Sequence, residues 1–250
     1  MRISASCYAV LGLGYSPPWC VNAGFVVGSE RTLVVDTGGN AYAGQTIAGY
    51  AAAVSPANQI VVINTEKHFD HIGGNRIFRD GGCEIWGHPA VARTPEEFQS
   101  EHEEFNATIP NQARRATREE RAFFHGTELT NPTHHVSDNA QFDLGGGCLA
   151  QVLFTPGHTA TNLSIWIPGE KVLFTGDCLI SEYVPNLDAG TELDWRTWLQ
   201  SLDRVTALGA DIAVPGHGPP ARDPRAVARM IEEVRRVLVE SIARGTSPTA

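Results

Sequence analysis

Four apolar segments of this chain end in short loops that combine a histidine or an aspartate with glycine. The segments are short runs rich in Val, Ile, Leu and Phe, as is typical of β-strands. Their loops are residues 65–75, 155–159, 175–178 and 215–219. Because glycine lets a backbone approach closely, each loop leaves its polar side chain unhindered. The fold must therefore carry polar groups at the ends of several strands.

Together the four loops supply seven side chains of the kinds that bind metal ions. They are Glu66, His68, Asp70, His71, His158, Asp177 and His217. Taken singly, a loop histidine is more often structural or exposed, and an aspartate at a strand end commonly caps a turn. Seven hard or borderline ligands, however, are enough for two metal ions. The set as a whole favours a metal site over seven unrelated structural roles.

The rest of the pattern predicts two clusters of strands, each followed by helices. Residues 24–36 hold two apolar runs separated by Gly28-Ser29-Glu30-Arg31, which indicates an antiparallel hairpin, and residues 59–64 indicate a strand buried on both faces. Further strands are predicted over 140–144, 148–154, 162–167, 171–175 and 212–214. Helices are predicted over 41–54, 194–208 and 223–243.

Residues 95–125 differ in composition from the rest of the chain. They are rich in Glu up to Glu104 and rich in Arg after Gln112. Phe98 and Phe105 recur near helical spacing, which predicts a helical hairpin with opposed charges. Such a hairpin is either a lid over a site or a solvated charged surface. We therefore expect one domain over residues 1–250, with a helical lid insertion at about 95–125.

Composition and charge exclude several classes of protein. A chain of 250 residues that is 42% hydrophobic and 19% charged buries a core and is not a disordered tail. No apolar run approaches the ~18 to 20 residues of a membrane span. The net charge of −9 argues against a nucleic-acid or membrane partner, because clustered Lys and Arg bind both. We expect a small-molecule substrate that is neutral or cationic; whether the chain forms a homodimer stays open.

The amino-terminal residues and the cysteines bear on the compartment. Residues 1–12 match a signal peptide poorly, because Ser and Cys interrupt a short apolar stretch and only Arg2 is basic. The five cysteines form no CxxC pair, so neither a disulfide framework nor a four-cysteine zinc site is predicted. These features predict a cytoplasmic protein with reduced cysteines.

In their order and spacing the loop residues resemble the metallo-β-lactamase superfamily. The family pattern is His-x-His-x-Asp-His followed by a distant His, Asp and His. Here His71, His158, Asp177 and His217 lie 87, 19 and 40 positions apart. The resemblance begins at the Val35-Asp36-Thr37-Gly38 strand end and covers nearly the whole chain. It implies an α/β fold, an αββα four-layer sandwich of two facing mixed β-sheets flanked by helices.

The resemblance also implies roles for the seven residues. Glu66, His68 and His158 would hold a first metal ion, and Asp70, His71 and His217 would hold a second, with Asp177 bridging the two. The implied cofactors are two divalent metal ions, zinc before manganese or iron. A water or hydroxide between the ions would be the nucleophile, and Asp70 would take or give the proton. The implied activity is hydrolysis of an ester-like bond in a thioester or a lactone, ahead of a β-lactam.

Two positions depart from the pattern of true β-lactamases. Glu66 stands where most members of the superfamily carry histidine. As a ligand it makes the first site harder and favours Mn²⁺ or Fe²⁺, or it weakens that site. Alternatively Glu66 points away and leaves one metal, or it is an ordinary solvated loop residue. Asp177 is a bridging aspartate that true β-lactamases generally lack, which brings the chain closer to glyoxalase II and lactonases. The alternatives are an iron-dependent oxidoreductase resembling persulfide dioxygenases and a non-catalytic metal-binding relative.

Three aromatic residues near the loops are candidate substrate contacts: Phe69, Trp19 and Tyr183. Phe69 lies inside the ligand loop itself, where core packing is the alternative. We expect Asp36 to orient a ligand histidine and not to bind metal itself.

Overall fold

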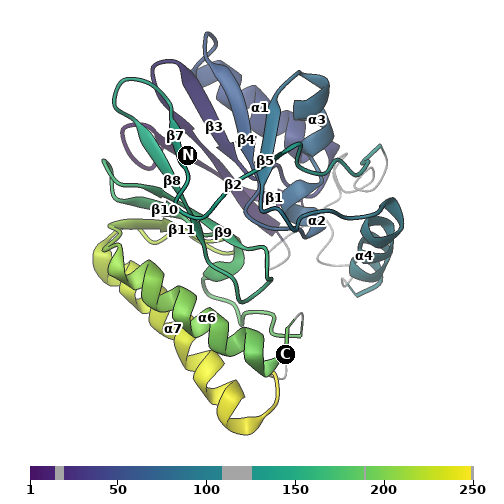
Figure 1. Ribbon diagram of the computed structural model, residues 1–250, viewed down its shortest axis with the longest axis vertical. Coiled ribbons are helices and arrows are strands. Elements are labelled where there is room, and N and C mark those ends of the chain that lie inside the picture. Colours follow the sequence, from purple (N-terminus) through teal and green to yellow (C-terminus); the bar gives the residue numbers. More distant parts are fainter. Residues whose placement is uncertain (15–19, 109–125, 189, 249–250) are drawn as a thin grey trace.

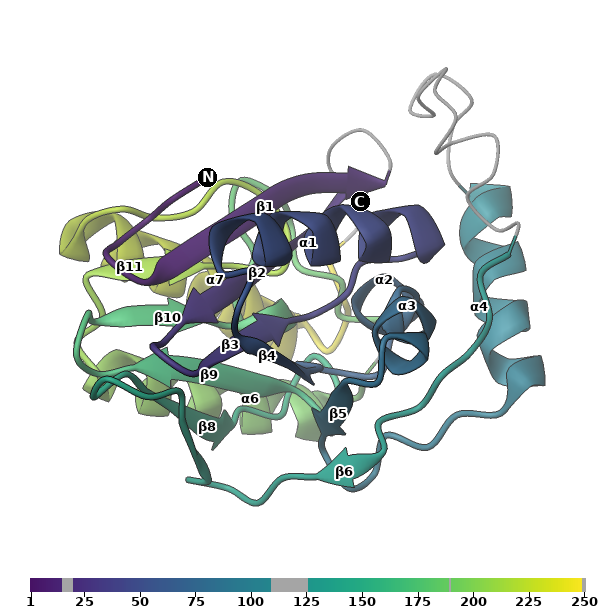
Figure 2. The same ribbon diagram turned by 90° about the horizontal axis from the view of Figure 1, so that it is seen from above.

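Two β-sheets face each other, and helices cover both outer faces. The computed structural model describes residues 1–14, 20–108, 126–188 and 190–248. In this part of the chain, α1 and α3 lie outside one sheet, and α6 and α7 lie outside the other (Figures 1 and 2). This four-layer arrangement confirms the αββα sandwich expected from the sequence.

The first sheet has six strands in the order β1-β2-β3-β4-β5-β6. The strands are β1 (Cys7–Gly14), β2 (Cys20–Val27), β3 (Arg31–Val35), β4 (Gln59–Ile63), β5 (Glu84–Gly87) and β6 (His134–His135). β1, β2 and β3 pair antiparallel, whereas β3, β4, β5 and β6 pair in parallel. The helices of this half are α1 (Ala41–Val54), α2 (Phe69–Ile72), α3 (Asn75–Asp80) and α4 (Pro95–Thr108).

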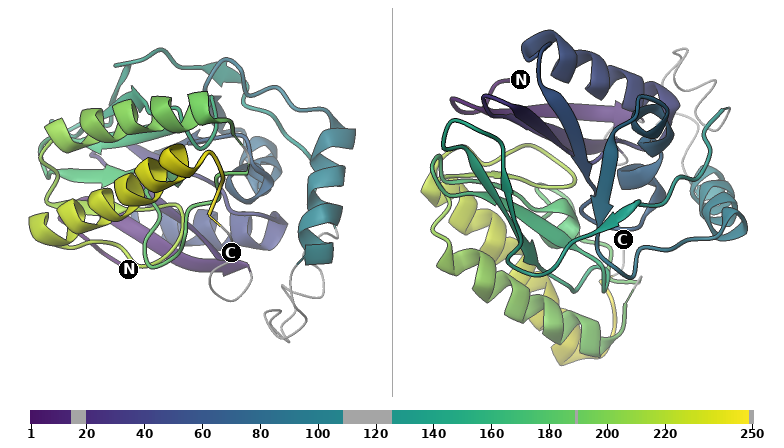
Figure 3. Two further views of the ribbon diagram at one scale, coloured as in Figure 1. Left: turned by 90° about the horizontal axis from the view of Figure 1, so that it is seen from below. Right: turned by 45° about the horizontal axis from the view of Figure 1, so that its top comes forward.

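The second sheet has five strands in the order β11-β10-β9-β8-β7. They are β7 (Gln141–Asp143), β8 (Leu149–Phe154), β9 (Leu163–Ile167), β10 (Val172–Phe174) and β11 (Ile212–Val214). Only the β10–β11 pair is parallel. A short 3-10 helix, η2 (Gly176–Cys178), follows β10, while α6 (Glu192–Ala207) and α7 (Pro224–Arg244) pack side by side over this sheet (Figure 3).

Helix α7 has clear start and stop signals at its two ends. Asp223 caps α7 by accepting a hydrogen bond from the Ala226 amide at 2.8 Å, and Pro224 occupies the first turn, where no amide donor is needed. The helix ends at Gly245, whose φ of 67° is left-handed. α7 buries Val227, Met230, Ile231, Val234 and Leu238 against α6 and the second sheet.

Three apolar clusters hold the layers together. The first lies between the sheets and includes Val61 and Ile63 of β4 opposite Ile165 of β9. The second joins α6 and α7 to the second sheet, and the third joins α1 to the first sheet. Val62 belongs to this third cluster, where it packs with Ile47 of α1. Strand β4 is therefore buried on both faces, as the sequence predicted.

Several sequence predictions find their place in this architecture. The hairpin over 24–36 is the β2–β3 pair. The predicted helical hairpin over 95–125 is described only in its first half, α4; residues 109–125 and Trp19 lie outside the described residues. None of the helices in the described ranges combines the length and the apolar character that a membrane crossing requires.

Candidate metal centre

The loops that carry the seven predicted ligands meet because their strands run in matching directions. β8 and β10 are both antiparallel to β9, and β11 is parallel to β10, so β8, β10 and β11 all point the same way. His158, Asp177 and His217 follow these three strands and leave the sheet at one edge. In the first sheet, β4 delivers residues 64–71. The Leu163 amide donates to the Thr65 carbonyl at 2.6 Å, which ties this loop to the second sheet.

A first group of ligand atoms consists of Glu66, His68 and His158, whose candidate ligand atoms all lie within 4.8 Å of one another. Glu66 Oε1 is 2.7 Å from His68 Nδ1, and His158 Nε2 is 3.3 Å from the same nitrogen. The other ring nitrogen of His158 lies 3.2 Å from the Asn186 carbonyl oxygen, which fixes the ring with Nε2 inward. These are the three residues expected to hold the first ion.

A second group consists of Asp70, His71 and His217, again with candidate ligand atoms within 4.8 Å. His217 Nε2 is 3.3 Å from Asp70 Oδ2, and His71 Nε2 is 3.9 Å from Asp70 Oδ1. The outer nitrogens are held: His217 Nδ1 lies 2.9 Å from the Cys20 carbonyl oxygen and His71 Nδ1 lies 2.9 Å from Asp36 Oδ2. Both rings therefore present Nε2 to the cluster, and Asp36 orients a histidine as the sequence predicted.

Asp177 lies between the two groups. Its Oδ2 is 3.3 Å from His158 Nε2 and 3.5 Å from His217 Nε2, and its Oδ1 is 3.4 Å from His71 Nε2. Gly216 makes this position available, because a Cβ atom at residue 216 would lie 1.8 Å from Asp177 Oδ1. The proline-glycine loop before His217 thus has a second role besides turning the chain, because its glycine leaves room for the carboxylate of Asp177.

The inward-facing atoms have the chemistry of a cation site. Among the described residues, both carboxylate oxygens of Glu66, Nε2 of His71 and Oδ1 of Asp177 are buried without a hydrogen-bond partner of acceptable geometry. Buried polar atoms are rarely left unpaired, and four of them aimed at one place call for a common partner. Imidazole and carboxylate donors suit Zn²⁺, Mn²⁺ and Fe²⁺. The residues present therefore fit the divalent ions that the sequence pattern implies.

The electrostatics of the cluster lead to the same conclusion. Burial raises the pKa of Asp70, but the positive charges of His71 and His217 outweigh burial and hold this pKa at about 2. Burial lowers the pKa of His68, yet the neighbouring carboxylates raise it to about 9. The pKa values of His71 and His217 are likewise raised well above their usual range by the carboxylates around them. The cluster thus stabilises positive charge, which protons or metal ions supply.

Helix α4 reaches the cluster from one side and contacts α2 (Figure 1). Glu101 Oε1 lies 3.9 Å from His68 Nε2, on the side of the ring that faces away from Glu66. Arg93 pairs with Glu101 and donates to the Lys67 carbonyl oxygen at 3.2 Å, between two predicted ligands. Neither Arg93 nor Glu101 has a local sequence signature. The fold alone brings them to the ligand loop.

The structure bears differently on the three predicted substrate contacts. Phe69 is only 3% exposed and packs edge-on against His102 of α4, with ring centroids 4.6 Å apart, which favours its alternative role in the core. Tyr183 is half-buried in the loop that follows Ile180, the residue that bridges to His217. Its role as a substrate contact stays a prediction, as does that of Trp19.

Two buried asparagines that the sequence analysis did not single out support the loops. Asn162 accepts a hydrogen bond from the Asp177 amide at 3.1 Å and donates to the Thr175 carbonyl oxygen at 3.1 Å. Asn22 donates to the carbonyl oxygens of Pro215 and Gly218 at 3.0 and 2.7 Å. Each fixes the backbone beside a predicted ligand, and a single asparagine within or beside a strand carries no local signal of such a role.

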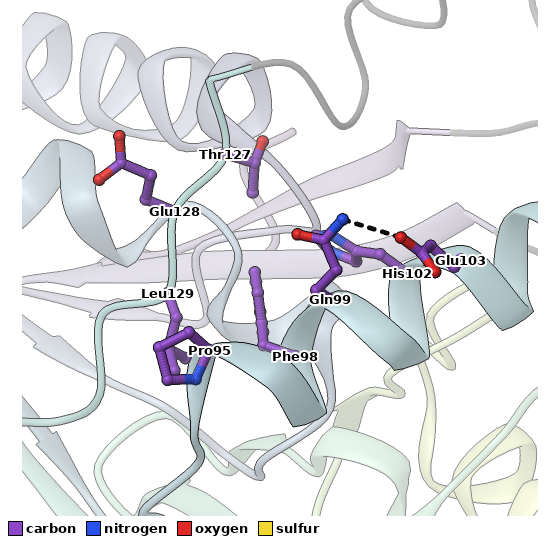
Figure 4. A pocket seen from close by; sticks show the side chains of 8 residues that line it. All are labelled: Pro95, Phe98, Gln99, His102, Glu103, Thr127, Glu128 and Leu129. Atoms are coloured by element: carbon purple, nitrogen blue, oxygen red, sulfur yellow. Dashed lines mark hydrogen bonds between the residues drawn. The ribbon is translucent and has the colours of Figure 1, made fainter.

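A cavity of about 380 Å³ lies beside the cluster, between α4 and residues 127–129 (Figure 4). Phe98, Gln99 and His102 line it from α4, and Gln99 donates to Glu103 at 2.8 Å. None of the seven predicted ligands lines this cavity.

Comparisons with known proteins agree with this architecture. A beta-lactamase-like protein 2 homolog from Caenorhabditis elegans is 36% identical over 88 residues, 34% of this chain and 27% of that protein. A hydroxyacylglutathione hydrolase from Brucella anthropi is 38% identical over 88 residues, 35% of this chain and 32% of that enzyme. The matched segments thus span less than a third of each relative's length.

Solved structures extend the likeness to the whole fold. A metallo-beta-lactamase family protein from Thermus thermophilus superposes with a TM-score of 0.70, covering 97% of this chain and 81% of its own, at 23% identity. The model of the metallo-beta-lactamase superfamily matches residues 17–217. Because that match covers most of the sequence and includes all seven predicted ligands, the chain belongs to the metallo-β-lactamase superfamily.

Proposed function

We propose that this protein is a metal-dependent hydrolase that cleaves an ester-like bond in a small molecule, a thioester or a lactone ahead of a β-lactam. The observation that carries the proposal is the convergence of seven ligand side chains from both sheets on one cluster. Asp177, in the bridging position, favours thioesters and lactones over β-lactams. The similarity to a hydroxyacylglutathione hydrolase supports the same choice.

Two divalent ions, zinc in the first instance, would be held by the two groups and by Asp177. When bound, such ions lower the pKa of a water molecule to near neutral pH and polarise a carbonyl. Glu66, His68 and His158 would hold one ion, and Asp70, His71 and His217 the other. Glu66 adds a third carboxylate to the cluster, which also makes Mn²⁺ or Fe²⁺ suitable.

Asp70 is the residue that would handle the proton. Its side chain is 15% exposed, whereas that of Glu66 is fully buried, so Asp70 is open to a substrate. Its low pKa keeps the carboxylate ionised, so its oxygens can accept a hydrogen bond from the attacking water and hold the proton transiently. The water oxygen adds to the acyl carbon, the bond from that carbon to the leaving oxygen or sulfur breaks, and Asp70 returns the proton to the leaving atom. Acid and alcohol or thiol are the products.

The test is hydrolysis by Zn²⁺-loaded protein of a panel containing a thioester, a lactone and a chromogenic β-lactam. We expect hydrolysis of the thioester or the lactone, its loss on chelation, and a fall in kcat of about 100-fold or more in Asp70→Asn with metal retained. Asp203→Asn, on the exposed face of α6, is the matched control and should behave as wild type. Metal binding without hydrolysis, or Asp70→Asn with full activity, would overturn the proposal.

One observation favours a second candidate, an iron-dependent oxidoreductase. Fully buried Glu66 adds a hard oxygen donor to the first group, and carboxylate ligands suit iron better than imidazole alone. Iron retained through purification, together with oxygen uptake on addition of a persulfide, would support this candidate over the hydrolase.

A further inference from the structure

Glu66 occupies an unusual position for a ligand of one metal ion. Its side chain is fully buried, and among the described residues neither carboxylate oxygen has a hydrogen-bond partner of acceptable geometry. Oε1 lies 2.7 Å from His68 Nδ1 of the first group and 3.4 Å from His71 Nε2 of the second. Glu66 is therefore in contact range of both groups at once.

The same conclusion follows from the sets of atoms that could share an ion. Glu66 clusters with His68 and His158, and it also clusters with His71 and Asp177, each time with candidate ligand atoms within 4.8 Å. Asp177 likewise contacts His158 of the first group and His71 of the second. Two buried carboxylates thus lie between the two groups of histidines.

A carboxylate at position 66 can bind metal ions in a way that a histidine at this position could not. Each nitrogen of a neutral imidazole that binds metal offers a single lone pair, whereas a carboxylate has two oxygens and about four lone-pair sites. A carboxylate can therefore contact two cations, and its negative charge reduces the repulsion between them. Glu66 in place of the usual histidine therefore changes how many metal ions the side chain can contact, as well as the charge of the site.

We propose that Glu66 is a bridging ligand, so that the two ions of this protein are joined by two carboxylates, Glu66 and Asp177. The proposal rests on the proposed metal-dependent function. It predicts that loss of Glu66 weakens both ions, whereas loss of a ligand belonging to one group weakens only one ion.

The experiment measures the affinity of both Zn²⁺ ions by competition with a chelator, starting from metal-free protein. We expect Glu66→Ala to weaken both ions at least about tenfold, since even the loss of an outer partner of a metal ligand costs that much. Glu66→Gln keeps the side-chain volume but offers one amide oxygen, and should also weaken both. His158→Ala is the one-group control and should weaken one ion while leaving the other near its wild-type affinity.

A second control separates ligation from charge. Glu101→Gln removes a negative charge 3.9 Å from His68 without removing a proposed ligand; it should change either affinity by no more than about threefold, as for partly exposed charges. Circular dichroism of each metal-free variant shows whether it is folded. If Glu66→Ala and Glu66→Gln weaken one ion only, the bridge is wrong and the two-ion site stands. If wild-type protein binds no Zn²⁺, the proposed function fails and the bridge with it.

Discussion

Asp36 shows how one residue outside the metal cluster controls a residue inside it. Its Oδ1 accepts a hydrogen bond from the Thr65 amide at 2.7 Å, and its Oδ2 accepts one from the Thr65 hydroxyl at 2.6 Å and lies 2.9 Å from His71 Nδ1. The backbone at Asp36 has a φ of 61°, a left-handed conformation that aspartate and asparagine tolerate better than most residues. Aspartate thus tolerates the backbone conformation at this position and also contacts the imidazole of His71.

We expect Asp36→Asn to keep this backbone conformation and to lower the affinity for the ion bound by His71 about 10- to 100-fold. The physical reason is that asparagine replaces one carboxylate oxygen with an NH2 group. That group would face a hydrogen-bond donor of Thr65 or His71, and two donors cannot pair with each other. Chelator competition with Zn²⁺ measures the effect. Asp143→Asn, on exposed β7, is the matched control. Unchanged Zn²⁺ binding in Asp36→Asn would show that His71 needs no such support.

Local chemistry explains which site residues the sequence could predict. The seven candidate ligands and Asp36 all lie in short segments that follow strands and contain turn residues, so short windows of sequence were enough. Glu101 and Arg93 lie about 30 positions from the ligand loop and reach it only because α4 packs against α2. Phe69 could not be assigned from sequence, since an aromatic residue in a loop looks the same whether it faces a substrate or α4.

At the scale of elements, the packing of α4 includes a buried histidine, His102, whose protonation is opposed. His102 of α4 packs against Phe69 and Phe98, with ring centroids 4.6 and 4.4 Å away. Burial, together with the positive charge of Arg93, lowers the pKa of His102 to about 4, and Asp70 offsets this only in part. Glu101 and Glu103 are its acidic neighbours on the same helix. Protonation of His102 therefore opposes the packing of α4.

We expect α4 to open more readily as the pH falls from about 6.5 toward about 4. In that interval His102 becomes protonated when α4 is open but stays neutral when α4 is packed. The free energy of opening α4 therefore falls by at most about 1 kcal/mol per pH unit. Hydrogen exchange of the α4 amides at pH 7 and pH 5, corrected for intrinsic rates, measures it. His102→Gln should remove the dependence; the same dependence in this variant would assign it to another group.

Hydrophobic periodicity predicted the long helices and the continuous apolar strands, but it did not predict short or irregular strands. α6 and α7 have clear apolar stripes, and β4 is a continuous apolar run. β1 contains Gly12 and Gly14, and its register with β2 shifts between Val10 and Leu13, so no clean alternation marks it. β6 is only the pair His134–His135, which becomes a strand because β5 lies beside it. Such strands are set by tertiary pairing, which a local window does not contain.

For the whole molecule, the metal centre is a property of the complete sandwich. The first sheet contributes Glu66, His68, Asp70 and His71, and the second contributes His158, Asp177 and His217. Each group of three combines residues from both sheets, so neither half forms a site alone. The order of the ligands in the sequence predicted the two groups through the family resemblance. Spacing could not predict that Glu66 would lie within reach of both, because that depends on how the backbone of residues 64–71 turns the side chains of Glu66, His68 and His71 toward one another.

The most direct test of the account is anomalous X-ray scattering at the zinc edge from crystals of the protein grown with Zn²⁺. We predict two anomalous peaks in the cluster, one contacted by His68 and His158, the other by Asp70, His71 and His217, with Glu66 and Asp177 contacting both. A single peak, or two peaks of which one lies away from these side chains, would contradict the two-ion centre on which the proposed hydrolysis depends.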